Sequence, residues 1–277
     1  MIDLDLEHPS AVKAMKEAEK AGHDWELGSV TITTKFKKGN GQLLTNKEYK
    51  QIIDERKKYG KEKSYKIIKS DVEEDLFHTA TLNLGDSGSY VYKFVTSYAY
   101  VYNEDSGIQR RHFVIGRHDW TGKTWSWGAV NTHDYDSSAD LLVGAWSIGP
   151  ISSSAARNVS VTYENLSGSK KYYTQSNLTQ VVDPNSPGHM SAWKVQERLT
   201  GDYAIKKAEV NNYTGWYDCA KVAENGTFRT VYAHGFKGET LSLAVGVSYP
   251  AGVSIGITPG TVDKVEKAVT YALMKRN

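Results

Sequence analysis

Apolar residues recur at every second position along most of the chain, which is the period of a β-strand. The clearest example covers residues 90–102, where aromatic side chains alternate with valines. Because both faces of such a strand are largely apolar, we expect it to lie inside a sheet. From residue 77 onward, turn sequences rich in Gly, Asn, Asp and Pro separate further runs of this kind. The pattern predicts a mainly β protein, with an antiparallel β-sandwich-like domain whose strands cover residues 76–258.

Helical patterning is confined to the two ends of the chain. Residues 10–21 form a run of strong helix formers that ends before Gly22. A second helix is expected over residues 46–59, where Thr45 and Glu48 have the spacing of a capping box. These features predict a short α-helical N-terminal region.

The C-terminal segment has two interpretations. Residues 262–274 place apolar side chains at helical spacing, which favours a C-terminal helix, whereas residues 267–275 can also be read as a strand. The chain then divides into a mixed helix and strand region, residues 1–75, and an antiparallel β domain, residues 76–277. We expect the two to pack together as one unit.

Composition narrows the classes of function. The net charge is only +2, so the sequence does not predict a nucleic-acid partner, which normally requires a concentrated basic face. Cys219 is the single cysteine, and this excludes an intramolecular disulfide framework. The high content of Tyr and Trp, with many Ser, Thr, Asn and Gly residues, is typical of extracellular β proteins. We therefore expect a secreted or cell-surface location.

No catalytic motif extends beyond a few residues. The string GDSGS at residues 85–89 resembles the nucleophile segment of chymotrypsin-like proteases, but the resemblance covers five residues only. In that family the histidine base and the aspartate precede a serine that comes late in the chain, whereas Ser87 lies in the first third. A tight turn is the favoured interpretation, and we expect the protein not to be an enzyme.

Aromatic and acidic residues are concentrated between positions 112 and 140. Flat rings beside short polar groups are suited to stacking on sugars, so we predict a ligand-binding surface, with the alternative that two of the tryptophans face the core. The predicted ligand-binding residues are Trp120, Trp125, Trp127 and Tyr135, of which Trp120 is expected to be the exposed ring. Three carboxylates loosely resemble a calcium loop without its central glycine and final glutamate: Asp134, Asp136 and Asp140. No other cofactor is predicted.

Two segments have the alternation of amphipathic β-hairpins. Residues 152–182 are rich in Ser, Thr and Asn, and residues 241–257 alternate bulky and small side chains. Such hairpins either cover the core of a sandwich or, in β-pore-forming toxins, leave the body to form a membrane barrel. The row of large apolar residues in 241–257 predicts a costly detachment. If either hairpin moves, we therefore expect it to be the Ser/Thr-rich segment 152–182.

These features favour an exported, non-enzymatic protein that binds a cell-surface ligand, such as a glycan or a receptor, through exposed aromatic residues. One alternative is a β-pore-forming toxin that oligomerises and inserts a Ser/Thr-rich hairpin into a membrane. Another alternative is a structural subunit of a surface assembly or virion.

Overall fold

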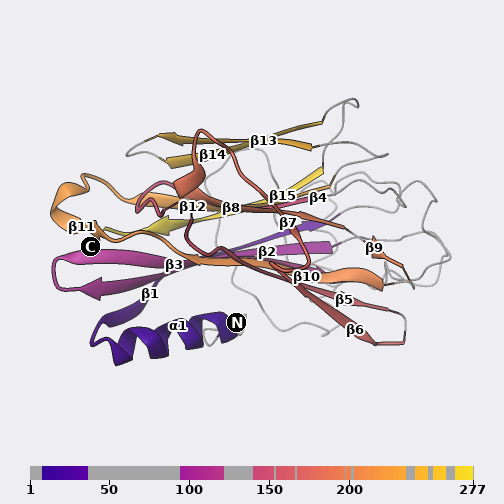
Figure 1. Cartoon of the computed structure of the whole chain (residues 1–277), viewed down its shortest axis with the longest axis horizontal. Coiled ribbons are helices and arrows are strands. Elements are labelled where there is room, and N and C mark those ends of the chain that lie inside the picture. The colour runs from indigo at the N-terminus through magenta and orange to yellow at the C-terminus, as the bar shows by residue number, and fades with distance from the viewer. Residues whose placement is uncertain are drawn as a thin grey trace, which may run out of the picture.

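The computed structural model describes residues 8–36, 94–121, 140–152, 154–165, 167–196, 198–200, 203–234, 241–248, 252–259 and 266–276. In these residues the protein is mainly β, with antiparallel sheets and one α-helix near the N-terminus. Four layers follow one another in Figure 1: a two-stranded hairpin, a five-stranded sheet, an eight-stranded sheet and the helix. The prediction of a β-sandwich-like domain with a helical N-terminal region is confirmed.

The larger sheet has the strand order β1-β2-β3-β10-β5-β6, with β11 paired to β3 and β9 paired to β10. Strand β2 lies between β1 and β3, as its two apolar faces predict. The strands of this sheet are β1 (Asp24–Phe36), β2 (Phe94–Ser106), β3 (Gln109–Thr121), β10 (Tyr203–Tyr213), β5 (Asn158–Glu164), β6 (Lys170–Thr174), β11 (Tyr217–Asp218) and β9 (Arg198–Leu199).

The smaller sheet has the order β15-β12-β4-β8-β7 and packs against the larger one. Its central strand β4 is buried along its whole length, which suits the continuous apolar run LLVGAW that follows Asp140. The strands are β15 (Glu266–Met274), β12 (Gly226–His234), β4 (Asp140–Trp146), β8 (Met190–Val195) and β7 (Thr179–Val181). Two short 3-10 helices, Pro187–His189 and Cys219–Lys221, lie in the connections.

The hairpin is formed by β13 (Leu241–Ser248) and β14 (Gly252–Pro259), and it covers the face of the smaller sheet that points away from the larger one (Figure 1). The helix α1 (Pro9–Lys20) covers the outer face of the larger sheet with a row of buried alanines, Ala11, Ala14 and Ala18. No helix in the described residues is long and apolar enough to cross a bilayer.

The expected helix near the C-terminus is wrong over the residues that the structure describes. Glu266–Met274 is strand β15, which pairs with β12 along its whole length. Every second residue of this strand is buried, namely Ala268, Thr270, Ala272 and Met274. This period-two burial, together with the pairing to β12, outweighs the helical spacing of the apolar side chains. The expected helix over 46–59 and the turn at 85–89 lie outside the described residues.

Candidate functional site

The hairpin β13–β14 separates its side chains cleanly into two faces. The face toward the smaller sheet carries large aliphatic side chains, of which Leu241, Val245, Val253 and Ile257 are buried and Leu243, Val247 and Ile255 are half-buried. The opposite face is exposed and carries only small residues: Ser242, Ala244, Gly246, Ser248, Ser254, Gly256 and Thr258. Because each strand has period two, a single alternating sequence produces both faces.

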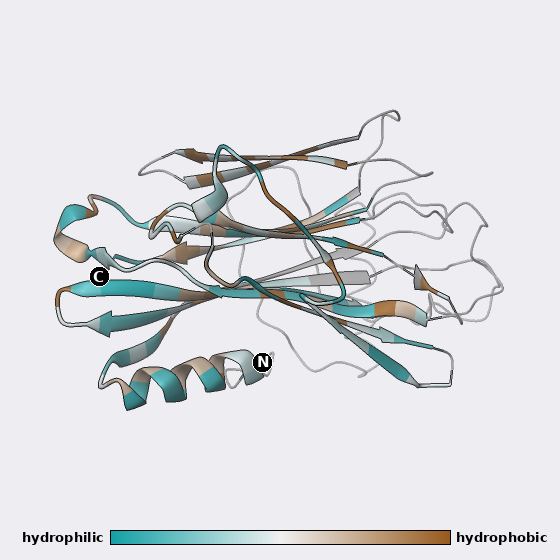
Figure 2. Cartoon of the chain, in the orientation of Figure 1, coloured by the Kyte–Doolittle hydropathy of each residue, from teal (hydrophilic) through white to brown (hydrophobic). Residues whose placement is uncertain are grey.

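The hairpin carries no charge, although one of its faces is exposed. From residue 241 to residue 259 the sequence contains no Asp, Glu, Lys or Arg, in a chain of which 24% of the residues are charged. In Figure 2 the two strands are brown and pale, whereas strong teal runs along the strands of the larger sheet. The exposed face of an ordinary soluble sheet normally mixes charges of both signs, so solvent exposure alone does not explain this composition.

The backbone of the hairpin pairs only with itself in the described part of the chain. β13 and β14 are in register from Leu241 opposite Pro259 to Ser248 opposite Gly252. The two strands form a separate two-stranded sheet, and none of their described residues has a β-ladder to either of the larger sheets. The hairpin can therefore leave the body without breaking a β-ladder between sheets.

Side-chain packing holds the aliphatic face of the hairpin on the body. Its aliphatic row lies on a cluster from the outer face of the smaller sheet that consists of Leu141, Val143, Ala145, Met190, Ala192, Val231 and Ala233. Full burial of one Val or Ile side chain is worth roughly 1.5–3 kcal/mol relative to water. Detachment into water is therefore costly, whereas transfer of the same row into another apolar environment recovers most of that free energy.

The Ser/Thr-rich segment 152–182 forms the expected strand pair, β5 and β6, but this pair is built into the larger sheet, which argues against the expectation that it is the segment to move. Its first half is β5, which pairs with β10 on one side and β6 on the other, and its last residues form β7 in the other sheet. Val159, Val161 and Tyr163 of β5 lie in the core between the sheets. Removal of this segment would break ladders in both sheets and open the main core.

The predicted exposure of Trp120 is wrong. Its indole is 3% exposed at the end of β3 and packs edge-on against Tyr232, with ring centroids 4.7 Å apart. The side chain faces the smaller sheet because position 120 shares the inward face of β3 with His118. The other predicted ligand-binding residues, Trp125, Trp127 and Tyr135, lie outside the described residues.

Asp140 is buried at the start of β4, with both carboxylate oxygens hydrogen-bonded to the protein. Oδ1 lies 3.0 Å from Nδ1 of His234, and Oδ2 accepts a hydrogen bond from the hydroxyl of Tyr232. Within the described ranges no group of three potential metal ligands occurs. Asp134 and Asp136 lie outside those ranges, so the calcium loop stays a prediction.

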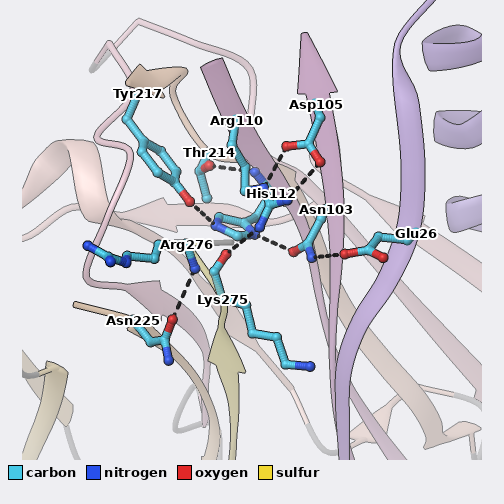
Figure 3. Close-up of polar contacts among 10 residues, drawn as sticks. All are labelled: Glu26, Asn103, Asp105, Arg110, His112, Thr214, Tyr217, Asn225, Lys275 and Arg276. Carbon is cyan, nitrogen blue, oxygen red and sulfur yellow. Dashed lines mark hydrogen bonds and ion pairs between the residues drawn. The ribbon is translucent and has the colours of Figure 1, made fainter. Parts of the chain in front are cut away.

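A second buried polar cluster, drawn in Figure 3, surrounds His112 in β3. Its Nδ1 lies 3.0 Å from Oδ1 of Asn103 and its Nε2 lies 2.8 Å from the hydroxyl of Tyr217. Burial, followed by the nearby Arg110 guanidinium, lowers the pKa of His112 to about 3. Arg110 also donates to the backbone carbonyl of Lys275. The imidazole is therefore neutral, and the cluster links β2, β3 and the C-terminal strand end as a structural network.

The sequence predicted a hairpin over residues 241–257, and the structure contains it as β13–β14. Its expected retention on the body stays a prediction. The informative signal was the absence of charge over residues 241–259, because alternation alone is shared with β5. The separation of the hairpin from both ladders was not available from the sequence.

No protein family model matches the chain, and no curated protein matches it. Among solved structures, one described as "Pore forming protein" is similar with a TM-score of 0.25 and 6% sequence identity, over 70% of this chain and 95% of that chain. A TM-score at that level assigns neither a fold nor a function to this chain.

Proposed function

We propose that this is a β-pore-forming protein, in which the β13–β14 hairpins of several copies leave their bodies and form one closed barrel in a membrane. The observation that carries the proposal is an uncharged, two-faced hairpin that packs on the smaller sheet and, in the described residues, has no β-ladder to either larger sheet. The alternative with a moving Ser/Thr-rich segment 152–182 is abandoned in favour of this hairpin.

The physics of the bilayer explains each feature of the hairpin. Lipid offers no hydrogen bonds, so strands can cross it only when neighbours pair every backbone group in a closed barrel. The aliphatic row then faces lipid, and the row of Ser, Thr, Ala and Gly faces the water-filled lumen. Each strand has eight described residues, close to the roughly 9–11 of a membrane-spanning strand. Tyr249, which follows β13 in the sequence, suits the aromatic girdle at a membrane surface.

Trp120 is buried and therefore cannot contribute an exposed ring to recognition of a cell-surface ligand. Such recognition stays a prediction for Trp125, Trp127 and Tyr135, and it is compatible with a pore-forming protein that first binds a target cell. Export, calcium binding and assembly into a virion or other surface structure also stay predictions.

The test compares two adjacent lysine substitutions in β14. Ile255→Lys places a charge at mid-strand on the face assigned to lipid, whereas Ser254→Lys places it on the face assigned to water. A lysine at the bilayer midplane costs about 2–4 kcal/mol. We expect Ile255→Lys to slow dye release from lipid vesicles by at least about 30-fold, at roughly tenfold per 1.4 kcal/mol. Ser254→Lys should retain release and shift the pore toward anion selectivity.

Circular dichroism and thermal melting check that both variants are folded. Because Ile255 is half-buried on the body, a lysine there can extend its ammonium group to solvent. Equal release from the two variants would contradict the assignment of faces. Absence of release from the wild-type protein on every vesicle and cell type tested would reject pore formation.

A further inference from the structure

Two polar side chains of the body hold the middle of β13 by its backbone. They come from the loop of residues 182–189, which joins β7 to β8. Oδ2 of Asp183 accepts a hydrogen bond from the N–H of Val245 at 2.6 Å. Oγ of Ser186 donates to the carbonyl oxygen of the same residue at 2.9 Å. Asp183 and Ser186 are both buried, so these bonds are shielded from water.

The loop is anchored to the body rather than to the hairpin. Oδ1 of Asp183 accepts from the N–H of Asn185 at 2.9 Å, which fixes the orientation of its carboxylate. The buried Arg157 donates to the carbonyl of Pro187 at 2.6 Å and to that of Met190, in β8, at 2.9 Å. The two bonds to Val245 therefore join the hairpin to a fixed point.

The position of these bonds matters for assembly. In an antiparallel pair the backbone N–H and C=O of a residue point either at the partner strand or away from it. Both backbone groups of Val245 point at the loop, so they lie on the outer edge of β13, away from β14. In a barrel built from hairpins, the outer edge of each strand pairs with the next copy.

We propose that Asp183 and Ser186 form an autoinhibitory clasp, which occupies the edge of β13 that must pair with a second copy of this chain. This inference rests on the proposed pore-forming function and adds how the hairpin is kept closed. While the clasp is formed, Val245 cannot join a ladder with a neighbouring hairpin. The occupant that replaces the clasp is the β-strand of another copy.

Acidification is a poor trigger for this clasp. The hydrogen bond from the N–H of Val245, followed by the one from Asn185, lowers the pKa of Asp183 below its usual range. Its carboxylate therefore stays ionised at neutral and mildly acidic pH, and the clasp remains formed. Competition by a neighbouring strand, with its full ladder of backbone bonds, is the opening mechanism that fits the geometry.

The experiment compares Asp183→Ala, Ser186→Ala and the double variant with the wild-type protein. The matched control is Asp218→Ala, because Asp218 also accepts a bond from a backbone N–H, that of Ala220, on a segment that pairs with β3. The first measurement is hydrogen exchange of the peptide over residues 241–248 in membrane-free solution. We expect Asp183→Ala to accelerate exchange at Val245 by about tenfold or more, Ser186→Ala by less, and Asp218→Ala not at all.

The second measurement is the lag before dye release from vesicles, which should shorten severalfold in the clasp variants and stay unchanged in the control. If Asp183→Ala does not fold, Asp183→Asn keeps a neutral acceptor, and we expect a smaller acceleration in both measurements. Unchanged exchange over 241–248 overturns the clasp. Faster exchange with an unchanged lag overturns its role in blocking assembly. Absence of release even from the wild-type protein rejects the pore function and this blocking role, while hydrogen exchange still decides whether the clasp holds the hairpin.

Discussion

The hairpins β5–β6 and β13–β14 have the same alternation of apolar and polar residues but opposite relations to the fold. β5 is paired on both sides and contributes Tyr163 to the main core, whereas β13 and β14 pair only with each other in the described structure. In β5 and in β13 alternate side chains are buried, so each strand has one buried face, as the period of two predicts. The difference between the two hairpins lies in their β-ladders to other strands. β5 is paired with β10 and β6, so it cannot detach from the body without breaking the larger sheet.

Charge distinguishes the two hairpins further. On β6, Lys170 is exposed to solvent and Lys171 is half-buried with its ammonium group over the ring of Tyr203, whereas residues 241–259 lack charge altogether. A charged residue on a surface that stays in water costs nothing, but on a surface that enters lipid it costs several kcal/mol. If β13–β14 enters lipid as proposed, its lack of charge avoids this cost, whereas β5–β6 carries charged residues and is built into the larger sheet.

The largest expected contrast is in stability. Tyr163→Ala removes a side chain that is 0% exposed, whose hydroxyl donates to the carbonyl of Gln196 at 2.9 Å. We expect the free energy of unfolding, measured with urea, to fall by about 3–5 kcal/mol. Ile257→Ala removes a similarly buried side chain from the hairpin. We expect it to reduce the free energy of unfolding by no more than the free energy that holds the hairpin on the body, because the two larger sheets are expected to stay folded when the hairpin detaches.

Hydrogen exchange separates these two substitutions. Ile257→Ala should accelerate exchange over residues 241–259 and leave β5 and β10 protected, whereas Tyr163→Ala should accelerate exchange in all three. If Ile257→Ala deprotects β5 as much as the hairpin, the hairpin is an integral part of the sandwich and the contrast fails.

The second contrast is in pH dependence. His118 is buried between Ser97 and Thr230, at 2.8 and 3.0 Å, and burial lowers its pKa to about 3. The unfolded chain takes up this proton below about pH 6.5 while the native state stays neutral, so the free energy of unfolding falls as the pH drops from 6.5 toward 3. For each such histidine the loss between pH 6.5 and 5 is on the order of 2 kcal/mol.

The clasp should behave differently over the same interval. The lowered pKa of Asp183 means that its contribution is lost only when the pH falls below the ordinary aspartate range. The free energy of unfolding measured with urea should therefore be lower at pH 5 than at pH 7. Hydrogen exchange over residues 241–248, corrected for its intrinsic pH dependence, should be the same at both pH values. His118→Gln keeps both hydrogen-bonding neighbours and should reduce the pH dependence of unfolding. If the free energy of unfolding of His118→Gln depends on pH as strongly as that of the wild-type protein, His118 is not the cause of the pH dependence.

The smallest contrast concerns two glycines. An added Cβ at Gly144 in β4 would lie 2.8 Å from Cγ2 of Val210, between the sheets. Gly144→Ala should therefore cost about 1–3 kcal/mol through overpacking. An added Cβ at Gly256 on the exposed face of β14 has its nearest neighbour, the carbonyl oxygen of Ala244, at 3.6 Å. Gly256→Ala should be neutral or stabilise by up to about 1 kcal/mol in thermal unfolding. A loss at Gly256 as large as that at Gly144 would mean that this face is covered.

Local chemistry in the sequence was enough to predict several elements. The run of helix formers over residues 10–21 corresponds to α1, and the two-sided apolar pattern of residues 90–102 predicted the inner position of β2. These predictions succeeded because helix propensity and the alternation of a strand act over a few neighbouring residues. The class of the fold followed from the number of such strands and the turns between them.

Predictions that depended on distant partners failed or stayed open. Trp120 was placed on the surface because its neighbours in sequence are polar, yet Tyr232 covers it from a strand more than one hundred residues away. The segment 266–274 has helical spacing, yet pairing with β12 makes it a strand. In both cases long-range packing outweighs local preference, because the free energy of burial exceeds the small propensity differences between conformations.

The sequence by itself determined that residues 241–259 form an uncharged, two-faced hairpin. Only the tertiary structure decided that this hairpin, unlike β5–β6, has no β-ladder to the two larger sheets in the part of the chain that the structure describes. It also decided that Asp183 and Ser186 hydrogen-bond to the backbone of Val245. The physical reason is that alternation encodes which side of a strand is buried, whereas backbone hydrogen bonds carry no side-chain signature. The partner of a strand edge is therefore decided when the whole chain folds.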